Sequence, residues 1–182
     1  MTLVAVVVAV GGVALGSAAL MRDASRDEEP RRVEAASEYF YRDLRSMIDD
    51  AVAVVEGTVS ETAPGLVVPD EEGGVGYTNV IISVDQVFSG DVTTDTIVLE
   101  EMTHLDGELV EVNGLDHLKE GDSGFFFLRR KDDGNYGLLG FQARLLKSGS
   151  EIADTVREDP LSRRLEAMTA AQLRAHINEH KP

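Results

Sequence analysis

The chain contains no cysteine and no tryptophan among its 182 residues. The lack of cysteine excludes disulfide bonds, thiolate metal sites and cysteine nucleophiles together. The lack of tryptophan, with aromatic residues at 5% of the chain, leaves few of the flat rings on which sugars stack. These absences remove several classes of enzyme and binding protein before any motif is considered.

Basic residues are scarce in the middle of the chain. Residues 51–125 contain sixteen acidic residues and one basic residue, Lys119, and the formal net charge of the whole chain is −16. A surface of this sign repels phosphate groups, so we expect no binding to nucleic acid or to anionic lipid headgroups. Solubility, a salty medium and a cationic partner all stay open as reasons for the acidity.

Charge is also missing from the start of the chain, where residues 2–21 carry only threonine and serine as polar side chains. Twenty helical residues reach about 30 Å, which is the thickness of the hydrocarbon core of a bilayer. We therefore predict one transmembrane or signal-anchor helix at residues 1–21, followed by a charged linker at residues 22–30 that ends in proline.

Two orientations of this helix are open. Ser17 and Ala19 form a small-x-small site typical of a secretory signal, although no basic residue precedes the apolar run. Basic residues follow the run instead, and by the positive-inside rule they favour a cytoplasmic C-terminal flank. These residues are Arg22, Arg26, Arg31 and Arg32.

The period of the apolar residues changes along the rest of the chain. Steps of three and four predict an amphipathic helix over residues 31–49. Alternating and β-branched segments predict short antiparallel strands within a domain at residues 50–156. Capping signals at Asp159-Pro160 and at residues 169–172 predict two helices within residues 157–182. The strands are expected at residues 51–60, 77–88, 94–101, 109–112, 125–128, 136–139 and 144–147, with a glycine- and proline-rich loop at 62–76.

Three segments of the predicted sheet resemble a known family. They are DDAVAVVEGTV at residues 49–59, VIISVDQVFSG at residues 80–90 and GDSGFFFLRR at residues 121–130. The first two are similar to the opening strands of netrin-like modules, the barrel type of the tissue inhibitors of metalloproteinases. All three together resemble uncharacterised envelope-anchored proteins of high-GC bacteria. The likeness covers residues 49–147.

This resemblance implies an OB-like β-barrel in an extracytoplasmic setting. Ser89 stands where the netrin-like modules usually carry lysine, and without cysteine their disulfides and cysteine-led inhibitory edge have no counterpart here. The expected fold class is mainly β, a small antiparallel OB-like β-barrel with flanking N- and C-terminal helices, preceded by one transmembrane or signal helix. We expect the domain outside the cell membrane, or secreted if the chain is cleaved near Ala19.

One motif raises the question of protease chemistry. Gly121-Asp122-Ser123-Gly124 is the sequence that surrounds the nucleophile of chymotrypsin-like proteases. That chemistry needs a histidine base, for which His104 and His117 are available. Phe125 stands where that family continues with Gly-Pro, and the competing interpretation is a polar turn that leads into the strand at 125–128.

A second candidate site lies near the C-terminus. His176 and His180 are four residues apart, so on a helix their rings share one face and could hold one metal ion. The glutamate of an HExxH motif is absent, and solvated surface histidines are the alternative. We predict no cofactor.

Residues 100–122 are rich in potential ligands. Their oxygen atoms could bind calcium, but the spacing of an EF-hand loop is absent. Paired carboxylates could also hydrolyse glycosides, and acids on exposed strand faces are the remaining interpretation. The residues are Glu100, Glu101, His104, Asp106, Glu108, Glu111, Asp116, His117, Glu120 and Asp122.

No catalytic set emerges from these motifs. We therefore predict a non-enzymatic, membrane-tethered, extracytoplasmic binding domain whose partners are the membrane, through the N-terminal helix, and an envelope protein. One alternative is an inhibitor-like module that acts on an envelope protease through a rigid loop at residues 64–69. Another is a hydrolase that uses Ser123 or the acidic stretch.

Overall fold

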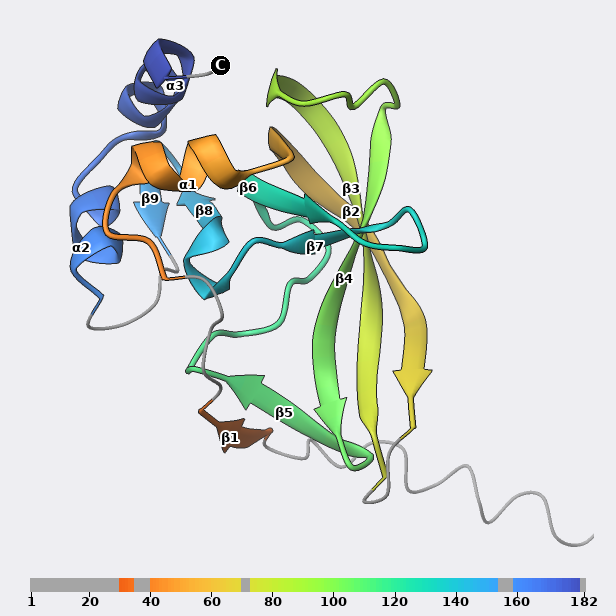
Figure 1. The fold of residues 1–182 in the computed structure, drawn as a ribbon. Helices are drawn as coiled ribbons and strands as arrows, with labels where there is room; N and C mark the ends of the chain where they lie inside the picture. The colour runs from red at the N-terminus through yellow and green to blue at the C-terminus, as the bar shows by residue number, and fades with distance from the viewer. Residues whose placement is uncertain (1–29, 35–39, 70–72, 154–158, 181–182) are drawn as a thin grey trace, which may run out of the picture.

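The computed structural model describes residues 30–34, 40–69, 73–153 and 159–180. Within these residues the chain is mainly β, as predicted, with the helices at one side of the strands (Figure 1). The strands are β1 (Arg31–Val33), β2 (Ala53–Val68), β3 (Val75–Ser89), β4 (Thr96–Leu105), β5 (Glu108–Val112), β6 (Ser123–Arg130), β7 (Tyr136–Leu138), β8 (Arg144–Ser148) and β9 (Glu151–Ala153). The helices are α1 (Leu44–Asp50), α2 (Pro160–Glu166) and α3 (Ala170–His180), with a 3-10 turn at Phe141–Ala143.

Five strands pair in a closed ring. The order β4-β3-β2-β6 continues through β7, which pairs with both β6 and β4. β8 and β9 extend the sheet from β6, while β5 and β1 extend it from β4. The predicted sheet was purely antiparallel, and this is wrong at two places, because β4 with β7 and β1 with β5 pair in parallel. The sheet is therefore mixed.

Two glycines allow the strands to approach closely where the ring bends. Gly57 on β2 lies opposite Gly124 on β6. A Cβ atom on Gly57 would lie 2.5 Å from the carbonyl oxygen of Ser83, and one on Gly124 would lie 2.5 Å from that of Leu145. Both positions therefore require glycine, which is common where a strand bends sharply against its neighbours.

Strand β6 separates two apolar clusters. Phe125 and Phe127 pack with the helices around Met47 and Leu173, while Phe126 and Leu128 point to the other side. All four β6 residues are fully buried. This confirms the predicted strand at residues 125–128, and the strand is covered on both faces, since alternate side chains of a strand point to opposite faces.

The predicted N-terminal amphipathic helix over residues 31–49 is wrong at residues 31–34 and 40–43, while residues 35–39 lie outside the described part of the chain. Arg31–Val33 is a strand that pairs with β5, and α1 begins only at Leu44. Asp43 caps this helix, because its carboxylate accepts a hydrogen bond of 2.9 Å from the backbone N–H of Ser46. Phe40, which the helical pattern placed on the buried face, is 64% exposed.

The predicted loop at residues 62–76 is also wrong. β2 continues to Val68 and β3 begins at Val75, so the two strands form one long hairpin. Pro64 fits into this strand because, among the described strands, β3 alone pairs with it there, and the missing N–H breaks no ladder on the other side. Proline and glycine indicated a turn, but here they lie in an edge strand.

The C-terminal helices agree with the prediction. The Asp159 carboxylate accepts a hydrogen bond of 2.6 Å from the backbone N–H of Ser162 at the start of α2. Thr169 and Gln172 form a reciprocal capping box at the start of α3. Leu173 and Ile177 bury the inner face of α3 in the cluster that also contains Met47 of α1.

The predicted membrane helix at residues 1–21 lies outside the described residues. Within the described part of the chain, no helix is both long enough and apolar enough to cross a bilayer.

Candidate functional site

The second half of β2 has a free edge. Residues 53–58 pair with β3 on one side and β6 on the other, and Val59 exchanges backbone hydrogen bonds with Gly121 and Asp122. Residues 60–68 pair with β3, and no strand in the described part of the chain pairs with their other side. We call residues 60–68 the distal edge. Such an edge offers unpaired backbone N–H and C=O groups to another extended chain.

The distal edge carries exposed apolar side chains at its end. Leu66, Val67 and Val68 are 53%, 62% and 45% exposed. An exposed, apolar edge strand is a feature that proteins usually cover or interrupt with charge. The pattern is therefore typical of a surface that pairs with another segment.

A groove of about 480 Å³ crosses the same end of the hairpin. Its lining comes from the ends of β2, β3 and β4, and Gly76 keeps it open beneath His104, since a Cβ atom there would lie 3.0 Å from that of His104. The lining residues are Thr62, Ala63, Pro64, Gly65, Val67, Gly73, Gly74, Gly76, Tyr77, Thr78, His104 and Gly107.

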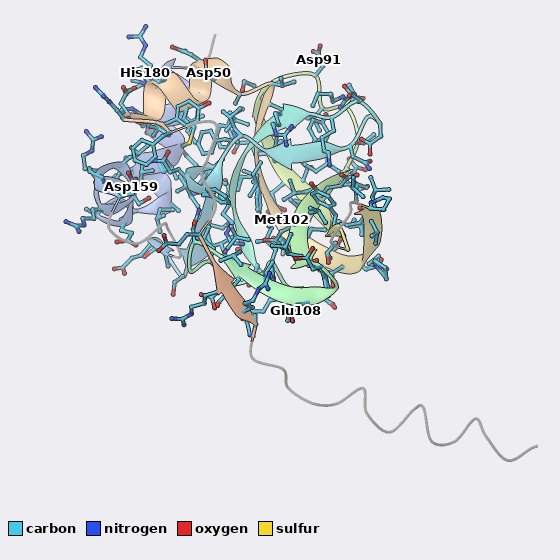
Figure 2. All side chains as sticks on the ribbon, turned by 60° about the horizontal axis from the view of Figure 1, so that its bottom comes forward. Asp50, Asp91, Met102, Glu108, Asp159 and His180 are labelled. Atoms are coloured by element: carbon cyan, nitrogen blue, oxygen red, sulfur yellow. The ribbon has the colours of Figure 1, made fainter. Side chains whose placement is uncertain are left out.

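Two acidic residues, Glu61 and Asp106, adjoin lining residues of this groove in the sequence. Glu61 is exposed on the distal edge, and Asp106 and Gly107 form the tight turn between β4 and β5, both with positive φ. The backbone N–H of Asp106 donates to the carbonyl oxygen of Gly74 on the groove wall. Figure 2 shows Glu108 at the far end of the molecule from His180, so the groove and the helices face different surroundings.

The first half of β2, residues 53–59, carries a buried glutamate that is paired with two cations. Glu56, 3% exposed, accepts hydrogen bonds from Lys147 Nζ at 2.7 Å and from Arg174 Nε and Nη2 at 2.7 and 2.6 Å. Burial alone raises the pKa of Glu56, but the hydrogen bonds and charges of these two cations outweigh it and hold the pKa below 4.5. The pair joins β2, β8 and α3.

The neighbouring acids Glu100 and Glu101 do not form a catalytic pair. They are consecutive on β4, so their side chains leave opposite faces of the sheet. Glu100 is buried and binds Lys131 and Asn135, whereas Glu101 binds Arg144 at 3.0 Å. The interpretation of the acids in this stretch as exposed strand residues therefore does not hold for Glu100, which is buried, or for Glu101, which is half-buried.

The Gly-Asp-Ser-Gly motif forms the turn that leads into β6. Asp122 accepts a hydrogen bond from the backbone N–H of Lys119, and Ser123 pairs with Thr58. Within the described residues, neither histidine considered as its base makes a hydrogen bond with Ser123. His104 Nδ1 lies 2.9 Å from Thr103 Oγ1, and His117 Nδ1 lies 3.9 Å from Glu101. Burial lowers the pKa of His117.

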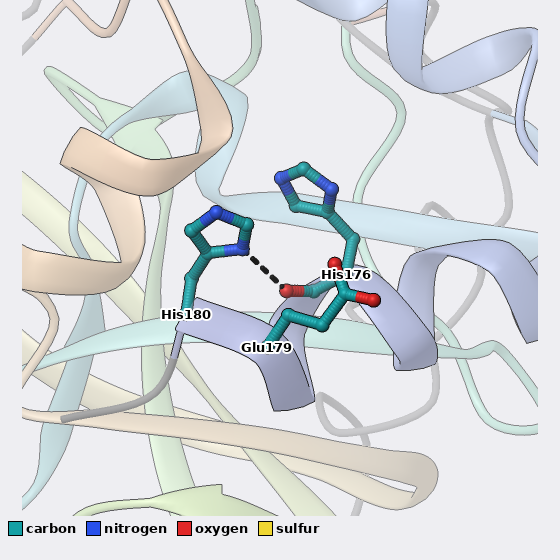
Figure 3. Close-up of side chains that lie close together, drawn as sticks. All are labelled: His176, Glu179 and His180. Carbon is teal, nitrogen blue, oxygen red and sulfur yellow. Dashed lines mark hydrogen bonds between the residues drawn. The ribbon is translucent and has the colours of Figure 1, made fainter.

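The structure places His176 and His180 together, as predicted, and adds Glu179. Potential ligand atoms of the three side chains all lie within 4.8 Å of one another on the last turn of α3 (Figure 3). The two imidazole rings stack with centroids 4.4 Å apart. Sequence reasoning missed Glu179 because it looked for HExxH, whereas His-x-x-Glu-His reverses that order and is another motif of zinc enzymes.

Comparison with known proteins adds no assignment. No protein-family model matches the chain, and no curated protein matches it. The geometry of the described residues is therefore the basis for a function.

Proposed function

We propose that the chain is a non-enzymatic binding domain that receives an extended segment of a partner protein at the distal edge. The observation that carries this proposal is the free, apolar edge of residues 60–68 beside the groove. Backbone pairing supplies affinity in this mode of binding, and pockets for alternate side chains supply specificity.

The charge of the site favours a basic partner segment. Glu61 and Asp106 are the sequence neighbours of the lining residues Thr62 and Gly107, and residues 51–125 contain sixteen acidic residues and one basic residue. Opposite charge speeds the encounter and excludes acidic segments. We therefore propose a segment in which apolar side chains alternate with lysine or arginine.

We further propose that the ring of β2, β3, β4, β6 and β7 is an OB-like barrel carried on a membrane tether at residues 1–21. Five strands in a closed ring with helices at one side support the first part. The apolar composition of residues 2–21 supports the second. The domain then stands outside the membrane, as the family resemblance implies.

Protease treatment of intact cells tests the placement. An external domain is digested by protease added to intact cells, whereas a cytoplasmic domain survives until the cells are lysed. Survival in intact cells overturns the external placement and leaves the binding proposal to its own test.

Binding is tested with two decapeptides, one alternating valine with lysine and the other alternating valine with glutamate. We expect the basic peptide to slow amide hydrogen exchange at residues 60–68, and the substitution Val67→Lys to remove that protection. Val52→Lys is the matched control, because Val52 is 53% exposed but lies outside the distal edge. If the basic peptide gives no protection at residues 60–68, the proposal is contradicted.

The inhibitor-like alternative takes a different form in this structure. Residues 64–68 belong to β2 and are not the rigid loop that the alternative required. An exposed strand is nevertheless the shape in which a polypeptide enters a protease cleft, by β-strand addition. Inhibition of an envelope protease by the intact chain, abolished by Val67→Lys, is the result that favours this alternative.

A further inference from the structure

We propose that the last turn of α3 binds one divalent cation of the zinc class through His176 and His180, with Glu179 as a third ligand. The three side chains offer potential ligand atoms within 4.8 Å of one another. A zinc ion bonded at about 2.1 Å needs ligand atoms roughly 3 to 4 Å apart, so the stacked imidazole rings rotate when they complete the site. This site is separate from the distal edge and does not depend on the proposed function.

The orientation of His180 supports the site independently of spacing. His180 Nδ1 lies 2.9 Å from the carbonyl oxygen of His176, drawn as the dashed line in Figure 3. A carbonyl oxygen only accepts, so Nδ1 carries the proton and donates. In the neutral ring this leaves Nε2 with a free lone pair, and an Nδ1–H bond to a backbone carbonyl is how metal-binding histidines are usually held.

The position on the helix also suits a cation. His180 is the last residue of α3, where the carbonyl groups of the final turn give the helix end a partial negative charge. Glu179 adds a full negative charge, and it is exposed, so an ion can reach it. The burial of Leu173 and Ile177 on the adjacent face holds the helix against the core, so the half-buried histidines are fixed relative to the domain.

The donor set selects the metal. Two imidazole nitrogens and one carboxylate are ligands typical of zinc, nickel or copper, whereas calcium and magnesium prefer oxygen alone. Three protein ligands leave at least one coordination position for water or for a side chain of another protein.

Titration calorimetry of the full chain in detergent micelles with zinc chloride tests the proposal. An excess of magnesium occupies the many carboxylates without occupying imidazole. We expect one zinc ion per chain, tenfold or more weaker binding for His180→Gln, and no measurable binding for the double variant His176→Ala/His180→Ala. Glu179→Gln weakens binding less than the loss of either histidine. Addition of zinc raises the melting temperature of the unmodified chain and leaves that of the double variant unchanged, since a ligand of the folded state stabilises it.

Asn178→Ala is the matched control, because Asn178 is exposed on the same turn and is not one of the three ligands. It should bind zinc as the unmodified chain does. Circular dichroism shows whether each variant keeps its helices. Unchanged zinc binding in a folded double variant overturns the proposal, as does binding of the unmodified chain no tighter than about 1 mM.

Discussion

Residues 53–59 and 60–68 belong to one strand and share one partner, β3, but they differ in what lies on their other side. β6 and the turn before it cover the first half, and Val54, Val55 and Val59 are fully buried there. Among the residues that the structure describes, nothing pairs with the other side of the second half, and its apolar side chains Leu66, Val67 and Val68 are exposed. A second neighbouring strand therefore makes similar residues a core in one place and a surface in the other.

The two halves also differ in the burial and ion pairing of their glutamates. Glu56 is neutralised by two cations, whereas Glu61 is exposed five residues further along. Glu56, the one acidic residue of the first half, stabilises the fold, and Glu61, the one acidic residue of the second half, lies on the surface on which we expect a partner. The following predictions test this difference.

The largest effect is expected for Glu56→Ala. This substitution leaves Lys147 and Arg174 without their shared carboxylate, and loss of one member of a buried pair is strongly destabilising. Because Arg174 is partly exposed, we expect a loss of roughly 2–4 kcal/mol in the free energy of unfolding, measured by urea titration. Glu61→Ala, the matched control on the same strand, should change it by less than about 0.5 kcal/mol. Equal losses would erase the distinction between the halves.

A smaller difference is expected for valine on the two halves. Val55→Ala removes two methyl groups from a fully buried side chain and should cost about 2 kcal/mol of unfolding free energy. Val67→Ala should leave stability within about 0.5 kcal/mol, because that side chain is mostly exposed. The same urea titration measures both. A large loss for Val67→Ala would show that the distal edge is already covered in the folded protein.

The ion pair of the first half should also respond to acid. The pKa of Glu56 is lowered in the folded state, so its charge contributes stability fully above about pH 4.5 and loses that contribution as the pH falls through the lowered pKa. Unfolding free energies of the unmodified chain and of Glu56→Gln should therefore differ by a constant amount near neutral pH and converge below pH 4.5. A difference that grows on acidification contradicts this assignment.

The smallest effect on stability is expected for Val67→Lys. A charge on an exposed edge discourages pairing without disturbing the core. We expect an unchanged urea midpoint with loss of peptide protection at residues 60–68. A loss of stability that accompanies the loss of binding would show that the substitution acts through the fold and not through the edge.

The sequence predicted the parts of the fold in which local pattern and packing agree. The apolar run at residues 125–128 and the capping box at Thr169 needed no tertiary information. Pro64 misled because its consequence depends on whether a second strand lies beside it, and spacing along the chain does not reveal that. Glu100 and Glu101 misled similarly, since burial beside Lys131 or Arg144 depends on residues far away in sequence. Glu179, by contrast, could be predicted from the sequence, because residues 176–180 read His-x-x-Glu-His.

The parallel pairing of β1 with β5 sets where the N-terminal segment joins the domain. Arg31 lies opposite Val110 and binds Glu108 at 2.9 Å, so the chain enters β1 from the side of the β4–β5 turn, beside the groove. The nine residues of the linker at 22–30 span at most about 30 Å when fully extended. With residues 1–21 in a bilayer, as proposed, this length limits the distance between the membrane surface and β1. The distal edge then stays close to the membrane surface. A partner segment would then have to lie close to the membrane surface to pair with the distal edge.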